Sequence, residues 1–212
     1  RGGTERHAVE RRDHRLRAVR MYTANVVDTV TLQCLGRPPN DHYRRLREAL
    51  EEADQSLTVS ATTDSELRSN PNFSGNPFVD GLVADGYCRV APPVEDPVDG
   101  DFGALDDGRG EGSVVSRARY HAYDVIDDQT SGQTVVSNAW RDTALVGLIV
   151  RLFEDNERMR AIVHTCDGPL VRAVESVVPY LGYYDVRAEQ YTPGEDSVPR
   201  RVPVSVPRTA TT

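Results

Sequence analysis

Four carboxylate residues are placed where chemistry could occur. Asp28 and Asp167 each follow a short apolar, β-branched segment, Glu66 lies in an expected helix, and Asp142 lies in the first turn of another. Carboxylates gathered in one place repel one another, which raises the pKa of some of them unless a cation neutralises the charge. Oxygen ligands without Cys or His favour hard ions, so Mg²⁺ or Mn²⁺ is expected rather than zinc.

Each of these acids also has a purely structural explanation. Asp142 could complement a helix dipole, Asp167 could be a turn residue before Gly168-Pro169, and Glu66 could be a solvated helix carboxylate. Asp28 is the hardest to explain in this way, because burying an acid at the end of a Val-Val strand is costly without a partner. The ordered set of four, rather than any one residue, supports a functional site.

Strands and helices are expected to alternate along the chain. The patterns predict strands at 22–28, 56–60, 87–91, 160–165 and 183–188, and helices at 41–53, 62–67, 77–83, 113–126, 139–156 and 169–178. Alternation of this kind indicates βαβ units and therefore an α/β fold, a three-layer α/β/α sandwich around a mainly parallel five-stranded sheet. Sites in such sheets lie beyond the carboxyl ends of the strands. Asp28 and Asp167 would meet there if the first and fourth strands are neighbours.

The composition predicts one folded domain with tails. Residues 1–20 form an arginine-rich, flexible N-terminal arm, 21–190 the domain, about 92–111 an acidic loop within it, and 191–212 a disordered tail. The interrupted apolar run at 144–153 is too short to span a bilayer, so no membrane is expected. Three cysteines without C-x-x-C spacing indicate neither zinc nor disulfides, and favour a reducing cytoplasm.

The net charge is −8, and all 25 basic residues are arginine, because the chain contains no lysine. Many aspartates with little lysine are typical of a surface hydrated in concentrated salt, so a halophilic prokaryotic source is expected. An acidic balance ordinarily argues against a nucleic-acid partner. In concentrated salt that argument is weak, because the whole-protein charge is screened.

Four short segments resemble the PIN-domain family in the right order, between Met21 and Ala188. They are Val27-Asp28-Thr29, Ser65-Glu66-Leu67, Arg141-Asp142-Thr143-Ala144-Leu145 and Thr165-Cys166-Asp167. The resemblance implies a metal-dependent endoribonuclease that hydrolyses RNA phosphodiester bonds, with RNA as its partner. The resemblance also suggests that the protein is the toxin of a toxin–antitoxin pair. In that case an antitoxin-like protein would be a further partner, and the chain could form a homodimer.

The resemblance also implies roles for individual residues. Asp28, Asp142 and Asp167 would carry one or two Mg²⁺ or Mn²⁺ ions, with Glu66 binding the second ion or orienting the attacking water. Thr165 would hydrogen-bond a ligand carboxylate or a phosphate. Arg141 would contact the RNA backbone, or would simply be solvated.

Two departures keep an alternative open. The family often has Asn two places after the first acid, where this chain has Val30, and the segment between Glu66 and Asp142 is longer than in compact members. The alternative is a catalytically weak or inactive PIN-like module that binds RNA or a protein. Val30 also excludes a haloacid-dehalogenase phosphatase, which needs an aspartate there. A response-regulator receiver is excluded because it needs a lysine and the chain has none. The usual nucleotide-binding proteins are excluded because the sequence contains no phosphate-binding glycine loop.

Overall fold

The computed structural model describes residues 21–35, 41–69, 77–94, 113–130 and 136–190, and these contain five strands and seven helices. In chain order they are β1 (Tyr22–Val27), α1 (Thr29–Leu35), α2 (Asp41–Ala53), β2 (Leu57–Val59), α3 (Ala61–Ser69), α4 (Pro77–Ala84), β3 (Cys88–Val90), α5 (Val114–Thr130), α6 (Val136–Asp155), β4 (Met159–Thr165), α7 (Gly168–Tyr180) and β5 (Val186–Gln190). The predicted arm at 1–20, the tail at 191–212 and most of the acidic loop lie outside the described residues.

The five strands form one parallel sheet in the order β3-β2-β1-β4-β5. β1 and β4 are central neighbours, paired from Tyr22 with Met159 to Val27 with His164. The chain leaves β1 toward β2 and β3 on one side and later toward β4 and β5 on the other. A crevice therefore opens beyond the carboxyl ends of β1 and β4, where ligands bind in open α/β sheets.

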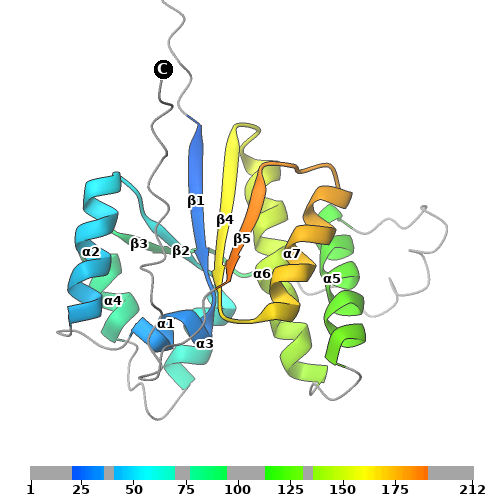
Figure 1. Cartoon of the computed structure of the whole chain (residues 1–212), viewed down its shortest axis with the longest axis horizontal. Coiled ribbons are helices and arrows are strands. Elements are labelled where there is room, and N and C mark those ends of the chain that lie inside the picture. The colour runs from blue at the N-terminus through cyan, green and yellow to red at the C-terminus, as the bar shows by residue number, and fades with distance from the viewer. Residues whose placement is uncertain (1–20, 36–40, 70–76, 95–112, 131–135, 191–212) are drawn as a thin grey trace, which may run out of the picture.

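Helices cover both faces of the sheet, which confirms the predicted three-layer α/β/α sandwich (Figure 1). Ala24 and Val26 of β1 point to the core shared with α5, α6 and α7. Val27 points to the opposite core, shared with α1 to α4. Successive side chains of a strand alternate between faces, so one apolar strand contributes to both cores.

The helix α1 was not predicted. Thr29, Val30 and Thr31 are β-branched and disfavour a helix on their own. The side chain of Asp28 overrides this preference, because its Oδ1 accepts a hydrogen bond from the Thr31 N–H at 2.7 Å and so caps the first turn. The strand-end acid is thus also a helix cap.

Several other boundaries differ from the predictions by one to four residues. Ser60, not Thr62, caps α3, since Ser60 Oγ accepts from the Thr63 N–H at 2.9 Å. α6 begins at Val136 rather than at 139, so Asp142 lies in its second turn and not its first. β5 begins at Val186 rather than at 183, because Tyr183 stacks on Phe153 of α6 with ring centroids 5.2 Å apart.

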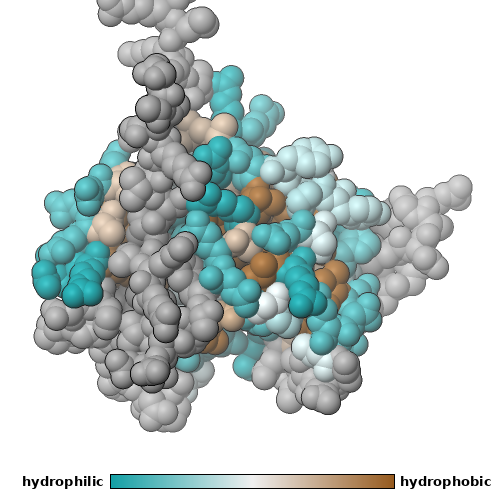
Figure 2. Space-filling model, viewed as in Figure 1, coloured by the Kyte–Doolittle hydropathy of each residue, from teal (hydrophilic) through white to brown (hydrophobic). Residues whose placement is uncertain are grey.

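The outer helix surfaces are polar. Figure 2 shows hydrophilic side chains over the outer surface of α2, whose buried positions, Leu46 and Leu50, face the core. Each such leucine contributes about 1.5–3 kcal/mol when it leaves water. None of the helices in the described part of the chain is long and apolar enough to cross a membrane. A cytoplasmic location stays a prediction.

Candidate active site

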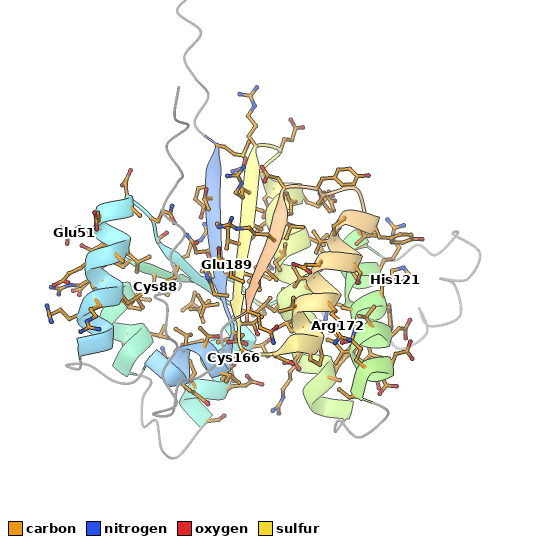
Figure 3. All side chains as sticks on the ribbon, viewed as in Figure 1. Glu51, Cys88, His121, Cys166, Arg172 and Glu189 are labelled. Carbon is orange, nitrogen blue, oxygen red and sulfur yellow. The ribbon has the colours of Figure 1, made fainter. Side chains whose placement is uncertain are left out.

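The four predicted acids line one cavity of about 310 Å³ at the carboxyl edge of the sheet. They come from four places: the end of β1, α3, the second turn of α6 and the N-cap of α7. Figure 3 labels Cys166, the neighbour of Asp167, at this edge. The lining residues are Asp28, Thr29, Val30, Ser60, Thr62, Thr63, Glu66, Arg141, Asp142, Leu145, Asp167 and Leu170.

Asp28 is 7% exposed and held rigidly. Its N–H donates to the His164 carbonyl at 3.2 Å, which extends the β1–β4 ladder by one residue. Its Oδ1 accepts from the Thr31 N–H, and its Oδ2 accepts from the Thr165 hydroxyl. Both carboxylate oxygens therefore have a donor, and each keeps a lone pair free for a cation.

Thr165 connects two of the acids. Its hydroxyl donates to Asp28 Oδ2 and accepts from the Asp167 N–H at 2.9 Å, so one fully buried side chain fixes the relative position of both residues. The side chain has no exposed surface with which to reach a phosphate. The hydroxyl of Thr165 was predicted to bind either a ligand carboxylate or a phosphate, and the structure places it beside the carboxylate of Asp28.

Asp142 carries the strongest electrostatic perturbation in the cavity. Burial, followed by repulsion from Asp167, Glu66 and Asp28, raises the pKa of Asp142 to about 7, and the neighbouring Arg141 only partly opposes the rise. Burial and the charge of Asp28 also raise the pKa of Asp167, which the nearby Leu170 N–H partly offsets. Three acids thus interact unfavourably with the ionised Asp142 carboxylate.

Glu66 is held at the opposite wall by two neighbours. The Thr29 hydroxyl donates to its Oε2 at 2.5 Å, and Arg141 Nη1 lies 3.7 Å from its Oε1. The Arg141 side chain is 55% exposed, so it stands at the mouth of the cavity. Thr29 thus orients Glu66, while Arg141 remains available to a ligand.

The sequence did not identify several residues of the wall. Leu145 and Leu170 supply an apolar surface, and Ser60 and Thr63 are joined by a 2.9 Å hydroxyl hydrogen bond. The Ser-x-x-Thr spacing after a strand was the available signal for that pair, since it is typical of a helix cap. Val30 is 45% exposed and lines the cavity where the family often has Asn.

A larger cavity, of about 610 Å³, lies at the opposite edge of the sheet. It is lined by residues around the start of β1 and the end of α2 and includes only two carboxylates, Glu51 and Asp54. None of the predicted site residues lies there. Convergent titratable groups indicate an active site better than volume does, so the smaller cavity is the candidate.

The acidic cavity suits a divalent cation in its chemistry. Among the described residues, no three Asp, Glu, His or Cys side chains are close enough to hold one ion by themselves. Mg²⁺ needs no such cage, because it retains several waters and binds through one or two carboxylates and substrate phosphates. The donors are all oxygens, and the raised pKa of Asp142 reflects burial and repulsion, both of which a bound cation would offset.

Comparison with known proteins gives one match. The family model described as the halobacterial PIN domain matches residues 21–190. No curated protein and no solved structure matches the chain.

Proposed function

The chain belongs to the halobacterial PIN-domain family, and on that premise we propose that it is a divalent-metal-dependent endoribonuclease that hydrolyses RNA phosphodiester bonds. PIN domains are generally nucleases and typically use divalent metals, so the family indicates a nuclease-type function. The family description also agrees with the halophilic source predicted from the composition.

One observation carries the proposal: four carboxylates from four separate elements line a single cavity, where burial and repulsion from the other three raise the pKa of Asp142 to about 7. A fold does not keep mutually repelling acids half-buried for stability, since each costs free energy when it ionises. A bound cation removes that cost. Sites with strongly shifted pKa values in a cavity are candidates for function on this ground.

The side chains divide the work. Asp28, Asp142 and Asp167 would hold the cation, one or two of them directly and the rest through its bound waters, with Glu66 available to a second cation. When bound, the cation polarises the phosphate, neutralises its charge and lowers the pKa of water. Thr165 keeps Asp28 and Asp167 in fixed orientation.

Two residues act on the substrate side. The Glu66 carboxylate, oriented by Thr29, accepts a hydrogen bond from the attacking water and draws off its proton. Arg141 at the mouth of the cavity donates to a phosphate oxygen. The apolar side chains of Leu145 and Leu170 reduce the water in the cavity, which strengthens these electrostatic contacts.

Val30 supports a second candidate function, a module that binds RNA or a protein without cutting. Its exposed apolar side chain lies on the cavity wall, where it offers no hydrogen bond to water. All four acids nevertheless line the cavity, together with the hydroxyl residues Thr29 and Thr62. For this reason we favour cleavage over binding alone.

The test is cleavage of labelled RNA with Mn²⁺ or Mg²⁺ in high KCl, for the parent chain and for Asp28→Asn. Asn can still accept from the Thr31 N–H, so α1 keeps its cap while the site loses a charge. We expect a loss of rate of about a hundredfold or more. Asp124→Asn, which removes an exposed carboxylate from α5, is the matched control.

Parent chain and Asp28→Asn behaving alike, with circular dichroism showing both folded, would end the nuclease proposal and favour the binding module. A role as a toxin, an antitoxin-like partner and a homodimer stay predictions from the family resemblance.

A further inference from the structure

A second cavity, of about 300 Å³, adjoins the acidic one. The two share Thr62, Glu66 and Arg141, so the Glu66–Arg141 pair forms the wall between them. The other lining residues are Ala61, Ser65, Ser69 and Pro93. A ligand that lies in both cavities must pass this pair.

The second cavity is lined by three hydroxyl groups and by one acid, Glu66. Ser69 Oγ donates to the Glu66 carbonyl at 3.0 Å, which leaves its lone pairs free to accept. Within the described part of the chain, the side chains of Thr62 and Ser65 make no hydrogen bond. Three hydroxyls on one helix can therefore donate to, or accept from, a polar ligand.

Pro93, which lines the cavity together with α3, is held in place by hydrogen bonds to its own segment. Arg151 of α6 donates to the carbonyls of Pro92 and Pro93 at 2.7 and 2.8 Å, and the Ala91 N–H donates to the Val59 carbonyl at 2.8 Å. The segment after β3 is thus tied to both α6 and β2. Pro93 lines the cavity together with the hydroxyls, and an apolar residue held in place in this way lowers the entropy cost of binding.

Arg141 is poised to exchange partners. Its 3.7 Å separation from Glu66 Oε1 is too long for a good hydrogen bond, and both side chains are partly exposed, so the pair is weak. A phosphate oxygen offers the guanidinium shorter, charge-assisted hydrogen bonds. A phosphate at the boundary of the two cavities would therefore displace Glu66 from Arg141.

We propose that the cavity between α3 and Pro93 is a nucleotide subsite for RNA, which holds the ribose next to the scissile bond while Arg141 holds the phosphate. The volume is at the lower end of the roughly 300–1,000 Å³ range of ligand pockets, which matches one small polar group and not a large ligand. This inference rests on the proposed function, because it places the substrate strand relative to the four acids.

The hydroxyl lining gives the subsite a preference for RNA over DNA. A ribose 2′-hydroxyl both donates and accepts, and it is the group by which proteins distinguish the two nucleic acids. Ser65 and Ser69 line only the second cavity, whereas Thr62 also lines the acidic one. Removing these two hydroxyls should therefore weaken RNA binding and leave DNA binding unchanged.

The test is equilibrium binding in EDTA, where neither nucleic acid is cut. Fluorescence anisotropy would follow a labelled RNA hexamer and the DNA hexamer of the same sequence at several KCl concentrations. Arg141→Gln should weaken both by about tenfold and reduce the slope of log Kd against log salt by about one. The Ser65→Ala/Ser69→Ala double variant should weaken RNA alone, by about fivefold.

Two variants elsewhere match these changes. Arg44→Gln removes an arginine of equal exposure that pairs with Glu48 in α2, and Ser176→Ala removes a hydroxyl that donates to a helix carbonyl in α7, as Ser69 does in α3. Both should bind as the parent does.

The outcomes separate the subsite from the nuclease. If the parent cuts RNA but Arg141→Gln and the double serine variant bind as it does, the subsite is wrong and the nuclease stands. If the parent does not cut, yet these variants bind RNA more weakly as expected, the subsite stands as part of a binding module. Absence of RNA binding by the parent would also overturn the subsite.

Discussion

Asp142→Asn should make the metal-free protein more stable while it abolishes cleavage. The substitution keeps the size of the side chain and removes a charge that sits half-buried among three other carboxylates. In the described part of the chain the Asp142 side chain has no hydrogen bond to lose. Stability and activity should therefore change in opposite directions, which a purely structural residue would not show.

The size of the gain follows from the pKa. A carboxyl whose pKa rises from 3.8 to about 7 on folding loses about 4 kcal/mol of stability above pH 7, at about 1.4 kcal/mol per pH unit. Asp142 is only partly buried, so water reduces much of this cost, and salt screens the part that comes from the other acids. We expect a gain of about 1–2 kcal/mol at pH 8.

The sign of the pH dependence is also fixed. The raised pKa means that Asp142 penalises the fold progressively as pH rises from about 4 to 7, and by a constant amount above that. The advantage of Asp142→Asn over the parent should therefore be largest above pH 7 and vanish near pH 4. It should persist in concentrated KCl in reduced form, because burial, the largest cause of the raised pKa, is not screened by salt.

The assay is urea unfolding in EDTA, followed by circular dichroism between pH 4 and 8.5. Asp124→Asn controls for the change in net charge, because Asp124 is exposed on α5. Added Mn²⁺ should stabilise the parent more than the variant. A loss of stability at pH 8, or a gain no larger than that of the control, would refute the repulsion among the acids.

Further predictions concern the hydroxyl of Thr165, the pH dependence of metal binding and the packing of α5 against α6. Thr165→Val should lower the free energy of unfolding, measured in urea, by about 1–3 kcal/mol and weaken Mn²⁺ binding by about 10–100-fold. Thr165→Ser, which keeps the hydroxyl, should behave as the parent does, and equal losses for the two variants would contradict the role of the hydroxyl. Mn²⁺ affinity, measured by calorimetry, should fall as pH decreases below about 7, since Asp142 then binds a proton instead; a flat profile would contradict this. Gly147→Ala should lower stability by about 1–3 kcal/mol in thermal unfolding, because its Cβ would lie 2.9 Å from Arg119 Cγ between α5 and α6, and an unchanged midpoint would show that the interface yields easily.

The strands and most helices could be predicted from the sequence because their signals are local. The apolar, β-branched run before Asp28 and the three- and four-residue spacing of Leu46 and Leu50 depend only on neighbouring residues. The helix α1 was missed for a related reason. Its first residues favour a strand. The helix cap that overrides this preference is the side chain of Asp28, which the sequence pattern identifies only as an acid of the site.

The sequence by itself determined which acids stand at strand ends and within helices, and hence that an oxygen-lined site was expected. Only the tertiary structure decided that β1 and β4 are neighbours, which brings Asp28 and Asp167 to one threonine. It also decided the raised pKa of Asp142 and the second cavity beside Arg141. The physical reason is that hydrogen bonds, burial and Coulomb repulsion act over a few ångströms in space. The residues that they join can lie far apart along the chain, as Asp28 and Thr165 do, which are separated by 137 positions.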